Sequence, residues 1–582
     1  MQMIKKLLES VREFRKPTVI TFILMVFEVF IEVLIPFITA DLVNAIKAGA
    51  ALDSVVKTGL ILVGMAFLSL ACGSLGGFTC SRASAGFAKN LRHDVFARVQ
   101  GFSFENIDKF STASLVTRLT TDIQNVQFAY MMLIRTAIRA PLMFLFAIVM
   151  AFVMGGPLAL TFVVVVPLLG FGMYLIARRA MPAFRAVFRK YDKLNESIEE
   201  NVRAMRVVKS FAREGYEKQK FAAASGNICA DFTHAERIVA LNSPLMQLCL
   251  YFNMIFILSV GSKLIVTSGG SYIDVGQISA MLTYGFQILM SLMMISMIYV
   301  ILTMSAESAA RIGEVLCEES TLKNPEKPVY DIPDGSVDFD HVSFKYSLSA
   351  KKYALSDIDL HIASGMTVGI LGGTGSSKST LIQLISRLYD VTEGCVRVGG
   401  RDVREYDLDS LRSAVAVVLQ KNLLFSGTIK ENLRWGDPDA TDEEMIAACK
   451  LAQADDFIRS FPDGYDTYIE QGGTNVSGGQ KQRLCIARAL LKKPRILILD
   501  DSTSAVDTRT DALIRAGFKS FIPETTKIII AQRVASVQDA DLIIVMDNGT
   551  IADMGRHDEL YARSPIYREV YQQQTNGGER DE

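Results

Sequence analysis

Six long apolar segments fill the first 305 residues, and they constrain the fold more than any other feature of the sequence. They span residues 17–41, 55–80, 132–154, 157–178, 243–267 and 277–304. Each can cross the hydrocarbon core of a bilayer, which is ~30 Å thick and needs about 20 apolar residues in a helix. Half of all residues are hydrophobic and the mean hydropathy is +0.27. The sequence therefore predicts an α-helical membrane domain with six transmembrane helices over residues 1–316.

The stretches between these segments are of two kinds. Residues 42–54, 155–157 and 268–276 are short and carry one basic residue, Lys47, whereas residues 81–131 and 179–242 are long and rich in Arg and Lys. The long stretches have helical periodicity, so the membrane helices should continue well beyond the bilayer. The first sixteen residues form a basic amphipathic pattern typical of a helix on the membrane surface. The positive-inside rule then places both chain ends and the long stretches on the cytoplasmic side of the cell membrane.

Charge and cysteine content exclude several other classes of protein. The net charge is -1, so no broad basic surface points to nucleic acid. The eight cysteines occur singly and form no CxxC pair, which argues against a zinc or thioredoxin-like site.

Two groups of residues inside the apolar segments are candidates for contact with a transported substrate. Glu28 and Glu32 are four residues apart in the first segment, so both carboxylates share a helical face. They either bind a cationic or polar substrate or are neutralised by another helix or by protons for structural reasons. The last segment carries Met290, Met294 and Met297, whose flexible side chains suit either varied apolar ligands or plain helix packing.

A soluble region follows the membrane segments. Residues 317–335 are acidic and contain prolines, as expected of a linker. Short β-like runs then alternate with helical patterns over residues 336–582, which predicts an α/β domain.

The first chemical motif of this domain is a glycine-rich turn between a strand at 368–371 and a helix that begins at Ser379. Backbone N–H groups in such a turn, together with the positive end of the helix dipole, bind phosphate oxygens. Lys378 would hold the β- and γ-phosphates and Ser379 would ligate Mg²⁺, although Ser377 stands where the motif requires glycine. The alternative is a glycine-rich turn without a ligand. The candidate residues are Gly372, Gly373, Thr374, Gly375, Ser376, Ser377, Lys378, Ser379 and Thr380.

Two further motifs follow in the sequence. The apolar run Ile496–Leu499 predicts a buried strand that ends at Asp500, which is placed to hold Mg²⁺ through water. Further upstream, the run NVSGGQKQRLCIARALL opens a helix with Ser477, Gly478, Gly479 and Gln480 at its start. Two glycines at a helix N-terminus allow close approach of an anion.

This run resembles the LSGGQ signature of the ABC transporter family, and the resemblance covers essentially the whole chain. Six spans fused to a C-terminal ATP-binding domain are similar to the exporter branch, in which two halves form one transporter and ATP lies between the Walker A loop of one half and the signature of the other. By resemblance, Tyr346 stacks on adenine, Gln420 senses Mg²⁺ and faces the membrane domain, and Glu470 lies near the coupling helices. The resemblance also implies a loop to the partner at Ser504-Ala505-Val506-Asp507 and coupling helices near 103–120 and 203–213.

Two departures from the family pattern fall in one ATP site. Asp501 replaces the catalytic Glu, which withdraws the carboxylate by about 1.5 Å, and a misplacement of that order costs about a hundredfold in rate. Gln532 replaces the switch His and carries no positive charge. The signature, which serves the other site, is near consensus with Val476 for Leu. The pattern therefore favours a heterodimeric exporter of hydrophobic or amphipathic, drug-like compounds, in which this subunit has the degenerate site and its partner has the intact Glu and His. A homodimeric lipid or peptide exporter and an ATP-gated regulatory membrane protein are the alternatives.

Overall fold

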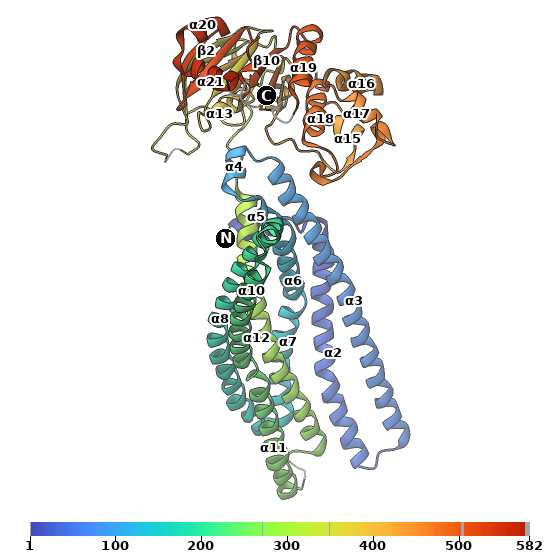
Figure 1. The fold of residues 1–582 in the computed structure, drawn as a ribbon. Helices are drawn as coiled ribbons and strands as arrows, with labels where there is room; N and C mark the ends of the chain where they lie inside the picture. The colour runs from blue at the N-terminus through green and yellow to red at the C-terminus, as the bar shows by residue number, and fades with distance from the viewer. Residues whose placement is uncertain (1, 270–271, 348–349, 502–505, 577–582) are drawn as a thin grey trace. The chain divides into compact units, whose positions relative to one another are not determined.

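The computed structural model describes residues 2–269, 272–347, 350–501 and 506–576, and it divides the chain into two compact units (Figure 1). The first unit contains residues 1–100 and 112–318, and the second contains residues 101–111 and 319–582. The short segment 101–111 therefore belongs with the C-terminal unit, although it lies within the predicted membrane half of the sequence.

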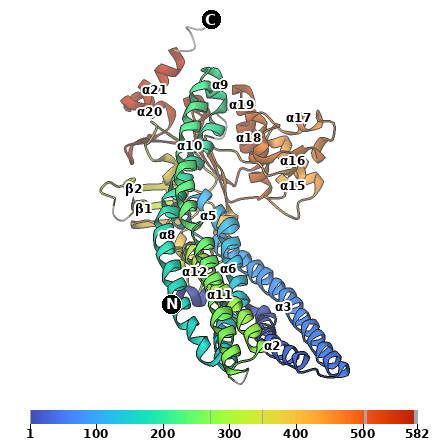
Figure 2. The same cartoon turned by 90° about the horizontal axis from the view of Figure 1, so that it is seen from below.

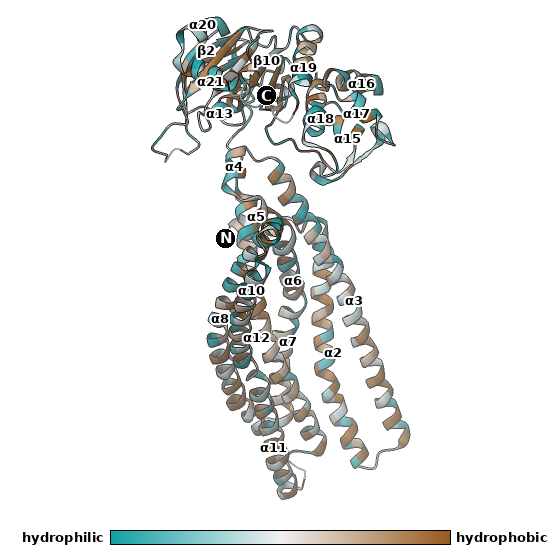
Figure 3. Ribbon diagram, in the orientation of Figure 1, coloured by the Kyte–Doolittle hydropathy of each residue, from teal (hydrophilic) through white to brown (hydrophobic). Residues whose placement is uncertain are grey.

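The first unit is helical. Its long helices are α2 (Arg15–Lys47), α3 (Leu52–Gln100), α6 (Ile123–Ile134), α7 (Thr136–Gly155), α8 (Leu160–Arg203), α10 (Glu214–Val239), α11 (Asn242–Ser268) and α12 (Val275–Cys317). The short ones are α1 (Gln2–Glu9), α5 (Thr112–Thr117), α9 (Met205–Ser210), 3-10 helices at Arg12–Phe14 and Gly156–Ala159, and a π-helix at Arg118–Asp122. Figure 3 shows hydrophobic residues along most of the length of α2, α3 and α12.

Several of these helices are much longer than a bilayer requires. Helix α3 has 49 residues, and at 1.5 Å per residue it is about 74 Å long, against ~30 Å for the hydrocarbon core. Helices α8 and α10 contain most of the basic stretch at 179–242 and lie side by side in both views (Figures 1 and 2). The prediction that the membrane helices continue beyond the bilayer agrees with these lengths.

Among the described residues there are five apolar helical runs long enough to cross a membrane, rather than six separate ones. One run, Thr112–Arg203, contains both predicted spans 132–154 and 157–178. The reason is the link between α7 and α8, which is a 3-10 helix, so the chain stays helical there. Gly156 has a φ of +48° and allows this abrupt change of direction. The number of six crossings remains a prediction.

The second unit is an α/β structure, as predicted. A six-stranded sheet has the order β12-β11-β3-β10-β9-β6, and a four-stranded antiparallel sheet has the order β2-β1-β4-β5. The strands are β1 (Val337–Phe344), β2 (Leu355–Ile362), β3 (Thr367–Gly372), β4 (Glu393–Val398), β5 (Arg401–Asp402), β6 (Val415–Val418), β7 (Gly427–Thr428), β8 (Tyr468–Ile469), β9 (Ile496–Asp500), β10 (Thr526–Ile530), β11 (Leu542–Asp547) and β12 (Thr550–Gly555). The α-helices are α4 (Phe104–Lys109), α13 (Lys378–Ile385), α14 (Leu408–Ala414), α15 (Ile429–Leu433), α16 (Asp442–Leu451), α17 (Asp455–Arg459), α18 (Gly478–Leu491), α19 (Thr508–Phe521), α20 (His557–Arg563) and α21 (Pro565–Asn576).

The centre of the large sheet is buried on both faces. Strands β9 and β10 are buried along their whole length, which is why their sequences are runs of Ile and Leu without polar alternation. Strands β6, β9, β10, β3 and β11 pair in parallel. Their carboxyl ends therefore meet along one edge, where α/β sheets bind their ligands.

Candidate functional site

The glycine-rich turn connects the end of β3 to the start of α13. Gly372 and Gly375 have φ of +158° and +84°, and Ser377 has a φ of +69° and a ψ of +24°. Ser377 is therefore in the left-handed region, which explains why the motif favours glycine there. A Cβ at Gly373 or Gly375 would meet nothing within 4 Å. The turn thus presents an open backbone surface on which a phosphate group can rest.

Lys378 lies folded over this turn. Its Nζ donates to the carbonyl oxygens of Gly372 and Gly373 at 2.9 and 2.8 Å and to Ser376 Oγ at 3.3 Å. Burial lowers the pKa of the Lys378 ammonium, and the carboxylates of Asp500 and Asp501 oppose that shift. The Lys378 ammonium now donates to neutral carbonyl oxygens. It can instead donate to phosphate oxygens, which are charged and therefore stronger acceptors.

Two carboxylates lie at the end of β9, Asp500 as its last residue and Asp501 directly after it. Asp500 Oδ2 accepts a hydrogen bond from Ser379 Oγ at 2.9 Å. Asp501 Oδ2 accepts from Gln532 Nε2 at 2.8 Å and from Gln420 Nε2 at 3.4 Å. Burial raises the pKa of both carboxyls. The structure thus gathers residues from the ends of β3, β9, β10 and β6.

These groups fit a Mg²⁺–nucleotide complex better than a metal held by protein alone. Among the described residues, no group of three or more His, Cys, Asp or Glu could hold a metal ion. Mg²⁺ usually takes one or two protein oxygens and completes its shell with phosphates and water. Ser379 and Asp500 supply such oxygens beside the phosphate turn, with Gln420 on the other side of Asp501.

Tyr346, the predicted adenine platform, belongs to a cluster of aromatic rings. Its hydroxyl is hydrogen-bonded to Thr380 Oγ1 at 2.9 Å, and its ring centroid lies 4.9 Å from that of Phe344 and 5.3 Å from that of Tyr389. The ring is 46% exposed. An exposed ring fixed to the helix that follows the phosphate turn is suited to stack on a base.

Sequence reasoning missed Tyr389. Its hydroxyl donates to Asp108 Oδ2 of α4 at 2.7 Å, and its ring lies 6.1 Å from Phe104. Helix α4 is capped by Ser103 and held by Asn106, whose Nδ2 donates to the carbonyl oxygen of Glu319. The rings thus connect Tyr346 to the first predicted coupling segment. No local signal identifies a partner 281 residues away.

The signature residues form the start of α18. Ser477 Oγ accepts from the backbone N–H of Gln480 at 3.3 Å, and Gln480 Oε1 accepts from the N–H of Ser477 at 2.9 Å. This reciprocal capping box accounts for both side chains. Gly478 is exposed and Gly479 is partly exposed, so they remain the positions at which an anion could approach the helix end.

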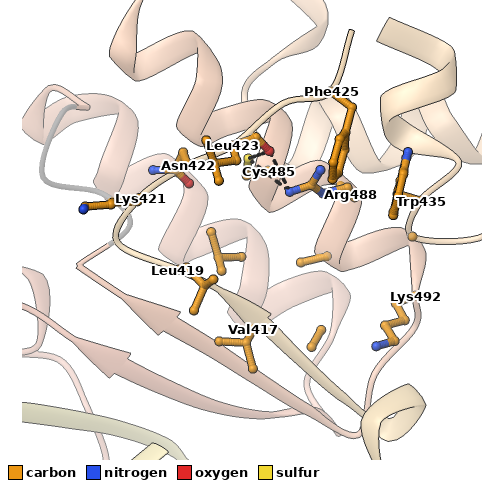
Figure 4. Close-up of a pocket in the computed structure, with 14 residues that line it drawn as sticks. Val417, Leu419, Lys421, Asn422, Leu423, Phe425, Trp435, Cys485, Arg488 and Lys492 are labelled. Atoms are coloured by element: carbon orange, nitrogen blue, oxygen red, sulfur yellow. Dashed lines mark hydrogen bonds between the residues drawn. The ribbon is translucent and has the colours of Figure 1, made fainter. Parts of the chain in front are cut away.

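The far end of α18 is tied to the segment that follows Gln420. A cavity of about 350 Å³ is lined by β6, residues 419–425, Trp435 and the second half of α18 (Figure 4). Phe425 and Trp435 stack with centroids 4.2 Å apart, and Arg488 Nη2 donates to the carbonyl oxygen of Leu423 at 3.2 Å. These contacts join the segment that follows Gln420 to the helix that begins with the signature.

The remaining candidates of this unit are placed as follows. Glu470 Oε2 accepts a hydrogen bond from Thr474 Oγ1 at 2.8 Å. Asp507 caps α19 by accepting from the N–H of Thr510. Ser504 and Ala505 of the predicted crossing loop lie outside the described residues, and Val506 is buried.

In the helical unit, Glu28 and Glu32 meet a common cation. Arg139 Nη2 of α7 lies 2.8 Å from both carboxylate oxygens of Glu32 and 3.5 Å from Glu28 Oε1. Glu28 is 7% exposed, and a Cβ on Gly73 of α3 would lie 3.0 Å from its Oε1. Arg139 therefore neutralises Glu32, as the structural alternative expects, whereas Glu28 lies farther from the same guanidinium. Met290 is partly buried, whereas Met294 and Met297 are exposed.

Comparison with known proteins extends over both units. A family model described as ABC transporter transmembrane region matches residues 18–293, and one described as ABC transporter matches residues 355–504. An uncharacterized ABC transporter ATP-binding protein of Bacillus subtilis (strain 168) is 35% identical over 95% of this chain and 96% of its own length. A fatty acid ABC transporter ATP-binding/permease protein of Mycobacterium tuberculosis (strain CDC 1551 / Oshkosh) is 33% identical over 82% of this chain and 75% of its own length. A solved structure of a bacterial Atm1-family ABC exporter with ATP bound has a TM-score of 0.83 at 26% identity and covers 96% of this chain and 98% of its own.

Proposed function

The chain belongs to the ABC transporter family, in the exporter form with a fused transmembrane and ATP-binding region, and we propose that it is the degenerate-site subunit of a heterodimeric exporter. ABC ATP-binding domains bind ATP, normally with Mg²⁺, and exporters of this family act as dimers with the ATP-binding domains in the cytoplasm. The proposal therefore concerns which partner, which ATP site and which substrate this subunit serves.

The observation that carries the proposal is the pairing of Asp501 with Gln532. Asp501 stands at the position of the general base, one methylene short of the family's Glu, and its Oδ2 already accepts the Gln532 amide at 2.8 Å. Gln532 supplies a neutral donor where the family has a histidine that can carry charge. A shortened base that is hydrogen-bonded to a neutral amide is poorly placed to take a proton from an attacking water.

The other residues of the site retain what ATP binding requires. Lys378 supplies a positive charge to the β- and γ-phosphates, the open turn at Gly373 and Gly375 receives them, and Tyr346 receives the base. Bound Mg²⁺ would neutralise phosphate charge beside Ser379 and Asp500. The site is therefore proposed to hold ATP and to hydrolyse it slowly.

The signature of this chain is proposed to complete the productive site. Gly478 and Gly479 lie at the N-terminus of the 14-residue helix α18, where exposed N–H groups and the helix dipole favour an anion. The partner would supply the Walker motifs, with Glu and His at the two positions that are degenerate here. Segments near 103–120 and 203–213 are proposed as the coupling helices, and α4 in the first of them contacts Tyr389.

The proposed substrate class is hydrophobic or amphipathic. The long helices expose many apolar side chains, including Met294 and Met297, and the Mycobacterium tuberculosis relative is named for fatty acids. That name favours a lipid-like amphiphile as a second candidate beside drug-like compounds. Because Arg139 neutralises Glu32, the proposed cationic site would centre on Glu28, whose Oε2 has no hydrogen-bond partner.

Transport in vesicles tests the proposal. The chain would be reconstituted with a half-transporter that carries Glu and His at the two positions, and inside-out vesicles would be given a cationic dye or a fluorescent fatty acid. ATP-dependent accumulation that requires both subunits is expected. Accumulation by this chain alone would favour a homodimer, and ATP binding without accumulation of any probe would favour a regulatory protein.

A further inference from the structure

The last described helix, α21, presents one continuous face to the body of the ATP-binding unit. Tyr567, Val570, Tyr571 and Gln574 recur at the spacing of neighbouring helical turns. Tyr567 is 1% exposed, and its hydroxyl is hydrogen-bonded to His557 Nδ1 at 2.7 Å. Val570 and Tyr571 pack against the core cluster that includes Val534. Three apolar contacts therefore fix the helix, and Gln574 lies one turn beyond them.

The side chain of Gln574 forms two hydrogen bonds with the backbone around Gln532. Its Oε1 accepts from the N–H of Val534 at 2.8 Å, and its Nε2 donates to the carbonyl oxygen of Gln532 at 2.8 Å. One planar carboxamide thus satisfies a donor and an acceptor two residues apart, as a neighbouring strand would. The N–H of Val534 begins the 3-10 helix Val534–Ser536, and such first-turn N–H groups have no partner within their own helix.

These two hydrogen bonds restrict the orientation of Gln532, whose side chain reaches the ATP site. With the Gln532 carbonyl and the Val534 N–H both held, the peptide planes that follow Gln532 cannot rotate freely. Gln532 Nε2 then lies 2.8 Å from Asp501 Oδ2. The backbone N–H of Asp501 in turn donates to the carbonyl oxygen of Ile530 at 3.0 Å, so the two segments are joined on both sides of the contact.

We propose that Gln574 is a positioning residue of the ATP site, so that the C-terminal helix sets the orientation of Gln532 toward Asp501 and the γ-phosphate. The inference rests on the proposed ATP site at Lys378, but it does not depend on the site being degenerate. It assigns a role in nucleotide binding to a residue that no sequence motif includes. It also predicts that a perturbation of α21 changes nucleotide affinity without contact with the nucleotide.

The chain offers a matched control on the same helix. Gln573 Nε2 donates to Glu569 Oε1 at 3.2 Å on the exposed side of α21. Gln573→Ala therefore removes a glutamine side chain from the same helix and leaves both hydrogen bonds of Gln574 in place. Gln574→Glu keeps an acceptor for the Val534 N–H but loses the donor to the Gln532 carbonyl. Gln532→Ala removes the side chain through which Gln574 would act.

The experiment uses the full-length chain assembled with its partner, whose own Walker lysine is replaced so that ATP binding reports on this chain's site. Hydrogen exchange would follow the peptide over residues 532–536, and titration would give ATP affinity for each variant. Gln574→Ala should speed exchange of the Val534 amide and weaken ATP binding by about fivefold each, the loss expected for one or two hydrogen bonds. Gln573→Ala should change neither quantity, and Gln574→Glu should lie between.

A double-mutant cycle separates positioning from a general structural effect. In the Gln532→Ala background, Gln574→Ala should cause no further loss of ATP affinity. An equal further loss there would overturn the inference, because Gln574 would then act without Gln532. Unchanged exchange and affinity in Gln574→Ala would also overturn it. If Lys378→Ala left ATP affinity unchanged, the proposed ATP site itself would fail, which is a distinguishable result.

Discussion

Replacement of Ser377 by glycine should stabilise the ATP-binding unit and improve its phosphate turn. Ser377 is the one residue of the turn that departs from the motif, and it is held at φ +69° and ψ +24°. This conformation is unfavourable in free energy for a residue with a Cβ, whereas glycine adopts it without steric cost. The substitution therefore removes strain at the position where the chain meets phosphate.

The magnitude follows from two opposing effects. The left-handed conformation costs a non-glycine residue about 1–2 kcal/mol. Glycine also lowers the free energy of unfolding by roughly 0.5–1 kcal/mol, because it gains more conformational entropy on unfolding than serine does. The net stabilisation should be about 0.5–1 kcal/mol, equivalent to a rise of roughly 1–4 °C in Tm for a domain of this size.

Intrinsic fluorescence can measure this change. The chain has a single tryptophan, Trp435, in the second unit, so thermal unfolding of the purified chain reports on that unit. Gly375→Ser is the reciprocal control: φ is +84° and a Cβ would meet nothing within 4 Å, so only backbone strain acts and Tm should fall. If Ser377→Gly lowered Tm, or both variants moved it in the same direction, the strain argument would be refuted.

Three further predictions concern charged side chains. Lys378→Ala should weaken ATP binding at this chain's site at least tenfold, since it removes a charge-assisted contact worth about 1.5–3 kcal/mol; unchanged affinity in a titration would contradict the assignment. Burial raises the pKa of Asp501 above its ordinary 3.8. Between 3.8 and the raised pKa the folded unit binds more protons than the unfolded chain, so its stability should fall as the pH rises through that range. Asp501→Asn should flatten that slope in urea unfolding followed by Trp435, and an unchanged slope would count against the shift. Glu28→Gln with Glu32→Gln should reduce transport of cationic compounds more than neutral ones in vesicles, whereas equal loss would assign the pair a structural role beside Arg139.

Local motifs were predicted well because their chemistry is contained in a few neighbouring residues. The strand, turn and helix around Lys378 follow from sequence order, and parallel pairing brings Asp500, Gln420 and Gln532 to the same sheet edge. The helix that begins after Ser477 was predicted as well, whereas the reciprocal capping between Ser477 and Gln480 was seen only in the structure.

Long-range partners could not be predicted in the same way. The bond between Tyr389 and Asp108 joins segments 281 residues apart, and Arg139 meets Glu32 across 107 residues. Gln574 lies in a stretch of three glutamines, and only the packing of α21 shows which of them faces residues 532–534. The six predicted apolar segments fall in five helical runs of the described residues, because a 3-10 turn at Gly156–Ala159 keeps α7 and α8 in one run.

Steady-state ATPase of the proposed heterodimer, purified with one mutation on each face, tests most directly whether the two ATP sites have unequal activity. Asp501→Ala should leave most of the activity, because Asp501 is proposed to contribute little at its own site. Gly478→Asp should abolish most turnover, because it places a side chain and a negative charge against the γ-phosphate at the site completed by the partner. Replacement of the partner's catalytic Glu should match Gly478→Asp. If Asp501→Ala proves as damaging as Gly478→Asp, Asp501 is a working base, and a homodimer with two active sites becomes the better account.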